Sequence, residues 1–299
     1  MLTKMKTPRP LHFKSGQWQA AIAPHGGNLF KLRYLPKNFD VVRTPRSYAK
    51  FAKATVVYGI PLLFLPNRIE DGWFELEGER YEFPINETIR NNHLHGFVHK
   101  RIWQLTSGKD TLGAVYTHTP DELWRYPFEI AVTYRFGAKK VDQVVRITNL
   151  AKEKMPLLFG QHTVMRLPRK SFIDVTTGRK INLTNRFIPD GTYSVARTHF
   201  TGCEGKLDKH TEITTVNGFR GAKITHPEVG LKITYSVDEQ YKFWMFWNGS
   251  YRNRFFCPEP QTCTVNAVKA AKLLDDSGVR FLLPGESISL KTSIAVSEK

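Results

Sequence analysis

Apolar and polar residues alternate along much of the chain, with the two-residue period of β-strands whose side chains point to opposite faces. Glycine-containing turns separate the alternating runs, as in Glu77-Gly78, which favours tight connections between antiparallel strands. The pattern predicts hairpins at residues 73–83, 128–149 and 229–248, and pairs of strands over 103–119 and 279–296.

Helical patterns are few and short, at residues 45–54 and 266–275. The least regular segment, residues 185–227, is rich in Gly, Thr and charges, and we interpret it as long loops over one face. Many antiparallel strands with little helix are typical of an all-β protein. We therefore predict one large antiparallel β-sandwich, a single domain spanning residues 1–299, with about the first ten residues disordered.

The composition predicts a soluble globular protein, because 41% of the 299 residues are hydrophobic and 24% are charged. No apolar run approaches the ~18 residues that a membrane helix needs. The basic start of the chain has no apolar stretch typical of a secretory signal. The three cysteines, Cys203, Cys257 and Cys263, are odd in number and form no C-x-x-C pair. We therefore expect reduced thiols and a cytoplasmic location.

The formal net charge of +17 is unevenly distributed, since residues 1–53 hold eleven Lys and Arg against the single acid Asp40. A basic surface attracts polyanions, anionic membranes or phosphorylated metabolites, although a solvated basic face is an equally simple interpretation. No nucleic-acid motif accompanies the charge, so we expect neither a nucleic-acid nor a membrane partner. The candidate catalytic residues come later in the sequence, which places the basic segment mainly away from them.

Unusual polar residues gather at three places in the middle of the chain. Arg68 stands in LPNRIEDGWF, and His93, His95 and His99 stand in NNHLHGFVHK. His162 follows an apolar strand and a glycine in LLFGQHTVMRLP. Residues of these types supply acid–base chemistry, metal ligation or hydrogen bonds to a bound molecule, and a structural role is the competing interpretation for the three clustered histidines.

A fourth candidate, Glu259, stands between Pro258 and Pro260 in FFCPEPQTCTVNA. The two prolines restrict the backbone on both sides of an ionisable group that has apolar neighbours. Such a carboxylate is either held in place for chemistry or is a loop residue paired with a surface arginine.

A metal site is not predicted. His93 and His95 are two residues apart and face the same way if they lie in a strand. No acid lies between His95 and Asp110, however, so the local ligand set is incomplete unless His162 and Glu259 contribute from a distance. The chain also has no nucleophile elbow and no Gly-rich nucleotide loop, and we expect no cofactor.

Acid–base chemistry by one histidine and one carboxylate remains, among several alternatives. Such a pair can open a cyclic hemiacetal, the base taking the proton of the anomeric hydroxyl while the acid protonates the ring oxygen. The C1–O5 bond then breaks, and the aldehyde can rotate and close on its other face.

At this point the sequence resembles the aldose 1-epimerase (galactose mutarotase) family. The blocks GIPLLFLPNRIEDG, NHLHG, FGQHTVMRL and CPEPQTCTVNA follow one another in the family's order, over roughly residues 17–296. The resemblance implies a large antiparallel sandwich, a site on a concave face and no cofactor.

The same resemblance implies individual roles. His162 is expected to protonate the ring oxygen, Glu259 to act as the base and His95 to assist near the ring oxygen. Arg68 is expected to hold sugar hydroxyls, and we add His93 to the substrate-binding candidates.

The chain departs from galactose-specific members of that family. The second glycine of an H-G-G block is Phe97, H-x-Y-F-N-L is HTVMRL, and the Asp that binds a sugar hydroxyl has no clear counterpart, Asp208 being a poor one. Galactose preference is therefore not predicted. Trp247 and Asn248 in FWMFWNG could supply a stacking platform and a donor, although a buried core strand is the alternative.

We predict a mutarotase acting on a small sugar, as a monomer or homodimer. The alternatives are a mutarotase for hexose 6-phosphates, favoured by the positive charge, and a non-catalytic carbohydrate-binding protein on the same fold.

Overall fold

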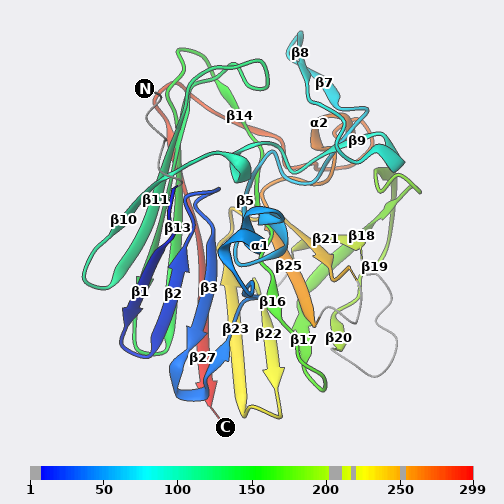
Figure 1. Ribbon diagram of the computed structural model, residues 1–299. Helices are drawn as coiled ribbons and strands as arrows, with labels where there is room; N and C mark the ends of the chain where they lie inside the picture. Colours follow the sequence, from blue (N-terminus) through cyan, green and yellow to red (C-terminus); the bar gives the residue numbers. More distant parts are fainter. Residues whose placement is uncertain (1–7, 202–210, 217–219, 250–253, 299) are drawn as a thin grey trace, which may run out of the picture.

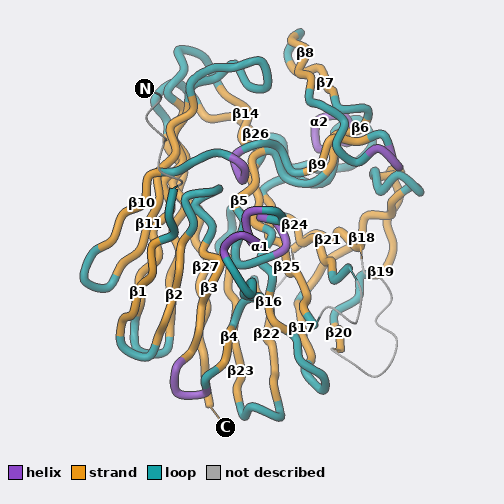
Figure 2. Tube along the Cα trace, in the orientation of Figure 1, coloured by secondary structure: helices purple, strands orange, loops and turns teal. Residues whose placement is uncertain are grey.

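The computed structural model describes residues 8–201, 211–216, 220–249 and 254–298, and antiparallel sheets form most of it (Figures 1 and 2). The largest sheet has nine strands in the order β10 (Gln104–Ser107), β11 (Thr111–His118), β12 (Phe128–Phe136), β13 (Lys140–Asn149), β27 (Ser287–Glu298), β23 (Leu231–Val237), β22 (Gly221–His226), β17 (Phe172–Val175) and β20 (His199–Thr201).

The second large sheet carries the candidate catalytic residues. Its path runs β19 (Pro189–Val195), β18 (Thr177–Leu183), β21 (Thr211–Val216), β24 (Phe243–Trp247), β25 (Phe255–Gln261), β15 (Phe159–Gln161) and β5 (Leu62–Phe64), with β16 (Met165–Arg166) also paired to β25.

Smaller sheets complete the architecture. A four-stranded sheet contains β1 (Leu11–Ser15), β2 (Trp18–Ile22), β3 (Leu29–Tyr34) and β4 (Phe39–Asp40), and three strand pairs join β14 (Met155–Leu157) to β26 (Arg280–Leu282), β6 (Arg68–Glu70) to β9 (Asn92–Leu94) and β7 (Trp73–Leu76) to β8 (Glu79–Glu82).

Side chains from both large sheets meet in one core, which makes the molecule a sandwich. Phe64 of β5 stacks on Phe128 of β12 with 4.8 Å between ring centroids. Tyr235 of β23 lies 6.3 Å from Trp244 of β24. Full burial of such a side chain contributes about 1.5–3 kcal/mol. The all-β sandwich predicted from the alternation is therefore confirmed.

Several predicted strand pairs are confirmed, and two of the connections differ. The hairpins β7–β8 and β12–β13 and the pair β10–β11 lie where the alternation places them. The hairpin predicted at 229–248 is wrong, because β23 belongs to the nine-stranded sheet and β24 to the other. Strands β26 and β27 likewise form but lie in different sheets. Alternation identifies a strand, but it does not identify the neighbour with which the strand exchanges hydrogen bonds.

The interpretation of residues 185–227 as loops is also wrong, since β19, β20, β21 and β22 lie there. Strands β19 and β20 are at sheet edges, and most residues of β19 are exposed or half-buried. An edge strand that buries little apolar surface has a weak hydrophobic pattern. The polar composition of this segment therefore concealed β19 and β20.

Helices are short, as predicted. Helix α1 (Tyr48–Ala52) lies within 45–54 and begins after Ser47, whose hydroxyl accepts the backbone N–H of Lys50 at 3.2 Å. Helix α2 (Ala267–Ala270) covers only the start of 266–275. Among the residues that the structure describes, no helix is long and apolar enough to cross a membrane.

Some sequence expectations fall on positions that the structure does not cover. Residues 1–7, for which disorder is predicted, lie outside the described residues. So do Cys203 and Asp208.

Candidate active site

Glu259 lies in the middle of β25, where every residue is buried. Strand β25 pairs with β24 over residues 257–261, but on its other edge it pairs with β16 only at residues 255–256 and with β15 only at Gln261. Proline lacks a backbone N–H, but no strand pairs with this edge of β25 along the gap, so a proline there removes no hydrogen bond between strands. Pro258 and Pro260 therefore stand where the sheet is interrupted.

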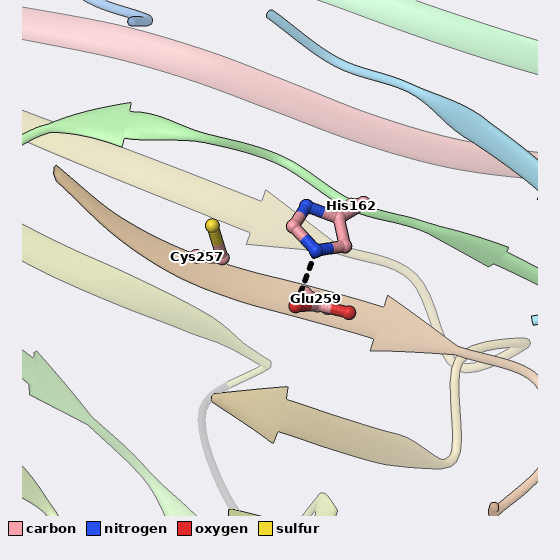
Figure 3. Close-up of side chains that lie close together, drawn as sticks. All are labelled: His162, Cys257 and Glu259. Carbon is pink, nitrogen blue, oxygen red and sulfur yellow. Dashed lines mark ion pairs between the residues drawn. The ribbon is translucent and has the colours of Figure 1, made fainter. Parts of the chain in front are cut away.

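His162 lies in the segment that joins β15 to β16 across this gap. The backbone N–H of His162 donates to the Pro61 carbonyl oxygen at 2.9 Å, and that of Val164 donates to Gly59 at 2.9 Å. These bonds hold the segment beside β25. The imidazole Nε2 lies 3.2 Å from Oε1 of Glu259, as Figure 3 shows. Two residues that are far apart in sequence thus form one buried pair.

The histidines of NHLHG do not face the same way, contrary to the expectation for a continuous strand. Strand β9 ends at Leu94, and His95 has a φ of 71°, in the left-handed region. The break turns His95 toward His162, with ring centroids 5.2 Å apart and the rings edge to face. His93 instead contacts the Pro84 carbonyl oxygen through Nδ1 at 2.7 Å and packs on Phe83.

A cavity of about 510 Å³ lies over these residues. Five of the sequence-predicted site residues line it, namely Arg68, His95, His162, Trp247 and Glu259. Trp247 lies edge to face against His162, with centroids 5.5 Å apart. Two predicted substrate-binding residues do not line the cavity: His93 is buried behind it, and Asn248 is fully buried. Their role in substrate binding stays a prediction.

Arg68 is held by an ion pair that sequence reasoning did not identify. Its Nε and Nη2 donate to the two carboxylate oxygens of Glu87, both at 2.8 Å. Asn92 donates to the same carboxylate at 2.9 Å, and Arg90 lies 3.3 Å from it. The two-pronged geometry fixes the guanidinium plane. Arg68, Glu87 and Arg90 all line the cavity.

Phe187 lines the cavity from the loop between β18 and β19 and is a second feature without a sequence signal. Its ring lies 4.9 Å from the guanidinium carbon of Arg68 and 4.3 Å from that of Arg90. Its φ of 59° is rare for a bulky residue. The neighbouring Arg186 anchors the loop through Glu70 and Asp71 at 3.1 and 2.7 Å and through the carbonyl of Arg90 at 2.9 Å.

Burial governs the protonation of the His162–Glu259 pair. Desolvation raises the pKa of Glu259 well above its usual range, opposed in part by the charge of Arg68. Desolvation also lowers the pKa of His162 to about 4. Both groups therefore favour their neutral forms, and the proton of the pair belongs to the carboxyl group. The pKa of His95 is lowered well below its usual range, mainly by burial and to a smaller extent by the charge of His162.

Several buried polar atoms of the pair lack protein partners. The side chain of Gln261 is a hydrogen-bond partner that helps to lower the pKa of Glu259. Besides this and the contact between Glu259 and His162, the Glu259 carboxylate and Nδ1 of His162 have no hydrogen-bond partner among the described residues. Glu259 is 1% exposed and His162 4% exposed. Because buried polar groups are normally satisfied, these atoms point to a bound polar molecule.

Cys257, which the sequence analysis expects to be a reduced thiol, lies two residues before Glu259 on the same face of β25. Its Sγ, an oxygen of Glu259 and a ring nitrogen of His162 lie within 4.8 Å of one another (Figure 3). These three residue types can ligate a soft divalent ion. Burial raises the pKa of the Cys257 thiol well above its usual range, so the thiol is neutral in the apo site. The sequence prediction of a metal-free site stays a prediction.

The sequence profile of the aldose 1-epimerase family matches residues 11–295. The chain belongs to this family. It is 22% identical over 282 residues to the uncharacterized protein YihR of Escherichia coli (strain K12), an alignment that covers 90% of this chain and 86% of YihR.

Solved structures of similar proteins share the fold. A galactose mutarotase-like protein from Clostridium acetobutylicum superimposes with a TM-score of 0.86 at 25% identity, covering 98% of this chain and 96% of that one. The GalM/aldose epimerase homologue from C. elegans gives 0.79 at 15% identity, covering 98% and 99%. The family resemblance drawn from the four motif blocks is thus confirmed.

The departures of this chain from the galactose-specific pattern also have a structural basis. A Cβ on Gly96 would lie 2.1 Å from the Phe64 carbonyl oxygen, and Gly96 has a φ of 58°, so this glycine is required by the backbone. Phe97, at the position of the second glycine, is buried against His118 with centroids 5.1 Å apart. In this member of the aldose 1-epimerase family, Phe97 therefore fills the core.

Proposed function

We propose that this protein is a mutarotase that interconverts the α and β anomers of an aldose, with His162 and Glu259 as its acid–base pair. The observation that carries the proposal is their 3.2 Å contact at a cavity of about 510 Å³. That volume lies within the range of small-molecule sites. Family membership supports carbohydrate epimerase chemistry.

The reaction needs one proton removed and one proton delivered. Glu259 accepts the proton of the C1 hydroxyl, His162 donates a proton to the ring oxygen O5, and the C1–O5 bond breaks as the C1 carbonyl forms. Rotation about C1–C2 exposes the other face of the aldehyde. The O5 hydroxyl then attacks C1, returns its proton to His162, and the new C1 oxygen recovers the proton from Glu259. Proton transfers balance over the cycle, and no cofactor is consumed.

A single proton transfer separates this protonation state of the pair from the reactive one. With the proton on Glu259 and His162 neutral, a shift of that proton across the 3.2 Å contact creates the carboxylate base and the imidazolium acid together. A sugar hydroxyl that donates to the carboxylate favours this charged form, because hydrogen bonds to an ionised group lower its pKa. Substrate binding is thus coupled to activation of the pair.

The remaining lining residues have roles that follow from their positions. In this proposal His95, which lies edge to face against His162, assists near the ring oxygen. Arg68, fixed by Glu87, can donate its remaining N–H groups to sugar hydroxyls. Trp247 offers an apolar ring surface of the kind that packs on the C–H face of a sugar.

The test is anomer exchange measured by NMR or polarimetry on freshly dissolved α-aldoses, corrected for spontaneous mutarotation. His162→Asn should reduce the catalysed rate about 10²–10⁴-fold, the usual contribution of a positioned acid or base. His199→Asn is the matched control, because His199 is an exposed histidine on β20 that pairs with Asp174 at 2.6 Å. Binding of sugars without any catalysed exchange by the parent protein would instead identify a carbohydrate-binding protein.

A further inference from the structure

A second cavity, of about 320 Å³, adjoins the sugar cavity and shares Val56 with it. It is formed by the segment that follows α1, the 3-10 turn Val98–Lys100 and His25. The mechanism described above does not use it.

This cavity is cationic. Lys53 and Lys100 line it together with His25 and His99, and no Asp or Glu is among its lining residues. Neither lysine forms an ion pair with any carboxylate in the described part of the chain, whereas Arg68 and Arg186 are both paired. Two unpaired ammonium groups at one concave surface repel each other and attract an anion.

Two histidines line the cavity beside these charges. Nδ1 of His99 contacts the Thr55 hydroxyl at 3.1 Å, and Nδ1 of His25 contacts the Tyr48 hydroxyl at 2.8 Å. Burial and the neighbouring Lys100 lower the pKa of His99 to about 3, which keeps this ring neutral. The site therefore combines two cations with two imidazole rings whose Nδ1 atoms are already engaged by hydroxyl groups.

The second cavity lies close to the acid–base pair. Val56 forms a wall common to both cavities. A charge on His162 lowers the pKa of His99, so the two rings are within electrostatic reach of each other. Lys53, the last residue of the basic segment 1–53, lines this second cavity, and the expectation that the segment lies mainly away from the sugar site stays a prediction.

We propose that this second cavity binds the phosphate group of a phosphorylated aldose whose anomeric centre lies at the His162–Glu259 pair, in the cavity that both residues line. The charge favours phosphate over a carboxylate, because a phosphate monoester carries about −1.5 to −2 at neutral pH and two ammonium groups match it. The inference rests on the proposed mutarotase function and names its substrate class as hexose 6-phosphates or related sugar phosphates.

The test compares the double variant Lys53→Gln/Lys100→Gln with the parent protein on a free aldose and on its 6-phosphate. The parent should have the lower KM for the phosphate. The double variant should raise that KM at least ~10-fold, since hydrogen bonds to charged groups are among the stronger ones, and leave the free sugar unchanged. Lys109→Gln/Lys272→Gln, which removes the same charge from exposed positions lining neither cavity, is the control.

A binding measurement separates this inference from the mutarotase proposal. The methyl α-glycoside of the 6-phosphate cannot open its ring, so calorimetry on it reports phosphate binding without catalysis. Loss of that binding in the Lys53/Lys100 variant supports the site even if no sugar is turned over. Equal binding by variant and parent, no preference for the phosphate over the free sugar, or equal preference for a uronic acid would each overturn the phosphate assignment.

Discussion

Replacing Glu259 by Gln removes the proposed base while preserving the size of the side chain. Glu259 is 1% exposed, and burial raises its pKa, so the carboxyl group favours its neutral form. A neutral amide resembles that state closely. We therefore expect the variant to fold, with a melting temperature equal to or above that of the parent, because the residual cost of burying an ionisable group is removed.

Catalysis should respond very differently. The amide cannot accept the proton of the C1 hydroxyl, and β25 is buried along its whole length, so bulk water is a poor substitute for the base. We expect the upper part of the usual range for acid–base groups, a loss of about 10³–10⁴-fold in kcat. That loss corresponds to about 4–5 kcal/mol of barrier.

The assay is the rate of α-to-β exchange per folded molecule, with folding verified by circular dichroism. Sugar affinity should change little, because the amide can still form hydrogen bonds with hydroxyls. A double variant with His162→Asn should lose less than the product of the two single losses, since both groups act in one step. Near-parental exchange by Glu259→Gln on every sugar that the parent converts would refute the assignment of the base.

Three further outcomes are expected. The free energy of unfolding should fall by at least ~1 kcal/mol from pH 6 to pH 5 in urea titrations. Burial lowers the folded pKa values of His95, His99, His162 and His226 below the unfolded value, so the unfolded chain binds more protons, whereas the raised pKa of Glu259 acts in the opposite direction. An unchanged urea midpoint would contradict the burial of these rings in neutral form. Exchange activity should survive chelation, whereas stoichiometric zinc in the purified protein together with loss of activity in EDTA would assign a metal to the Cys257 cluster. Arg186→Gln should raise KM several-fold by releasing the loop that carries Phe187, while Arg179→Gln, which removes a comparable exposed ion pair with Asp275, should not; equal effects of the two would count against the anchoring role.

Local patterns were sufficient to predict many of the strands and the main catalytic candidates. The alternation of β12 and β13 follows directly from one buried and one more exposed face, and the hairpin between them needs only a short turn. Glu259 stood out because two prolines restrict the backbone around an ionisable group that has apolar neighbours. The order of the four motif blocks was enough to indicate the family.

Tertiary structure decided what these residues face, because that depends on contacts between segments distant in sequence. No local pattern distinguishes His93 from His95; only the left-handed backbone at His95 turns one ring into the core and the other toward the pair. Phe187 reaches the cavity through a loop that Arg186 anchors to the carbonyl of Arg90, far away in the sequence. The cationic cavity likewise exists only because folding brings Lys53 close to Lys100. The distribution of charge along the sequence does not predict that these two residues meet.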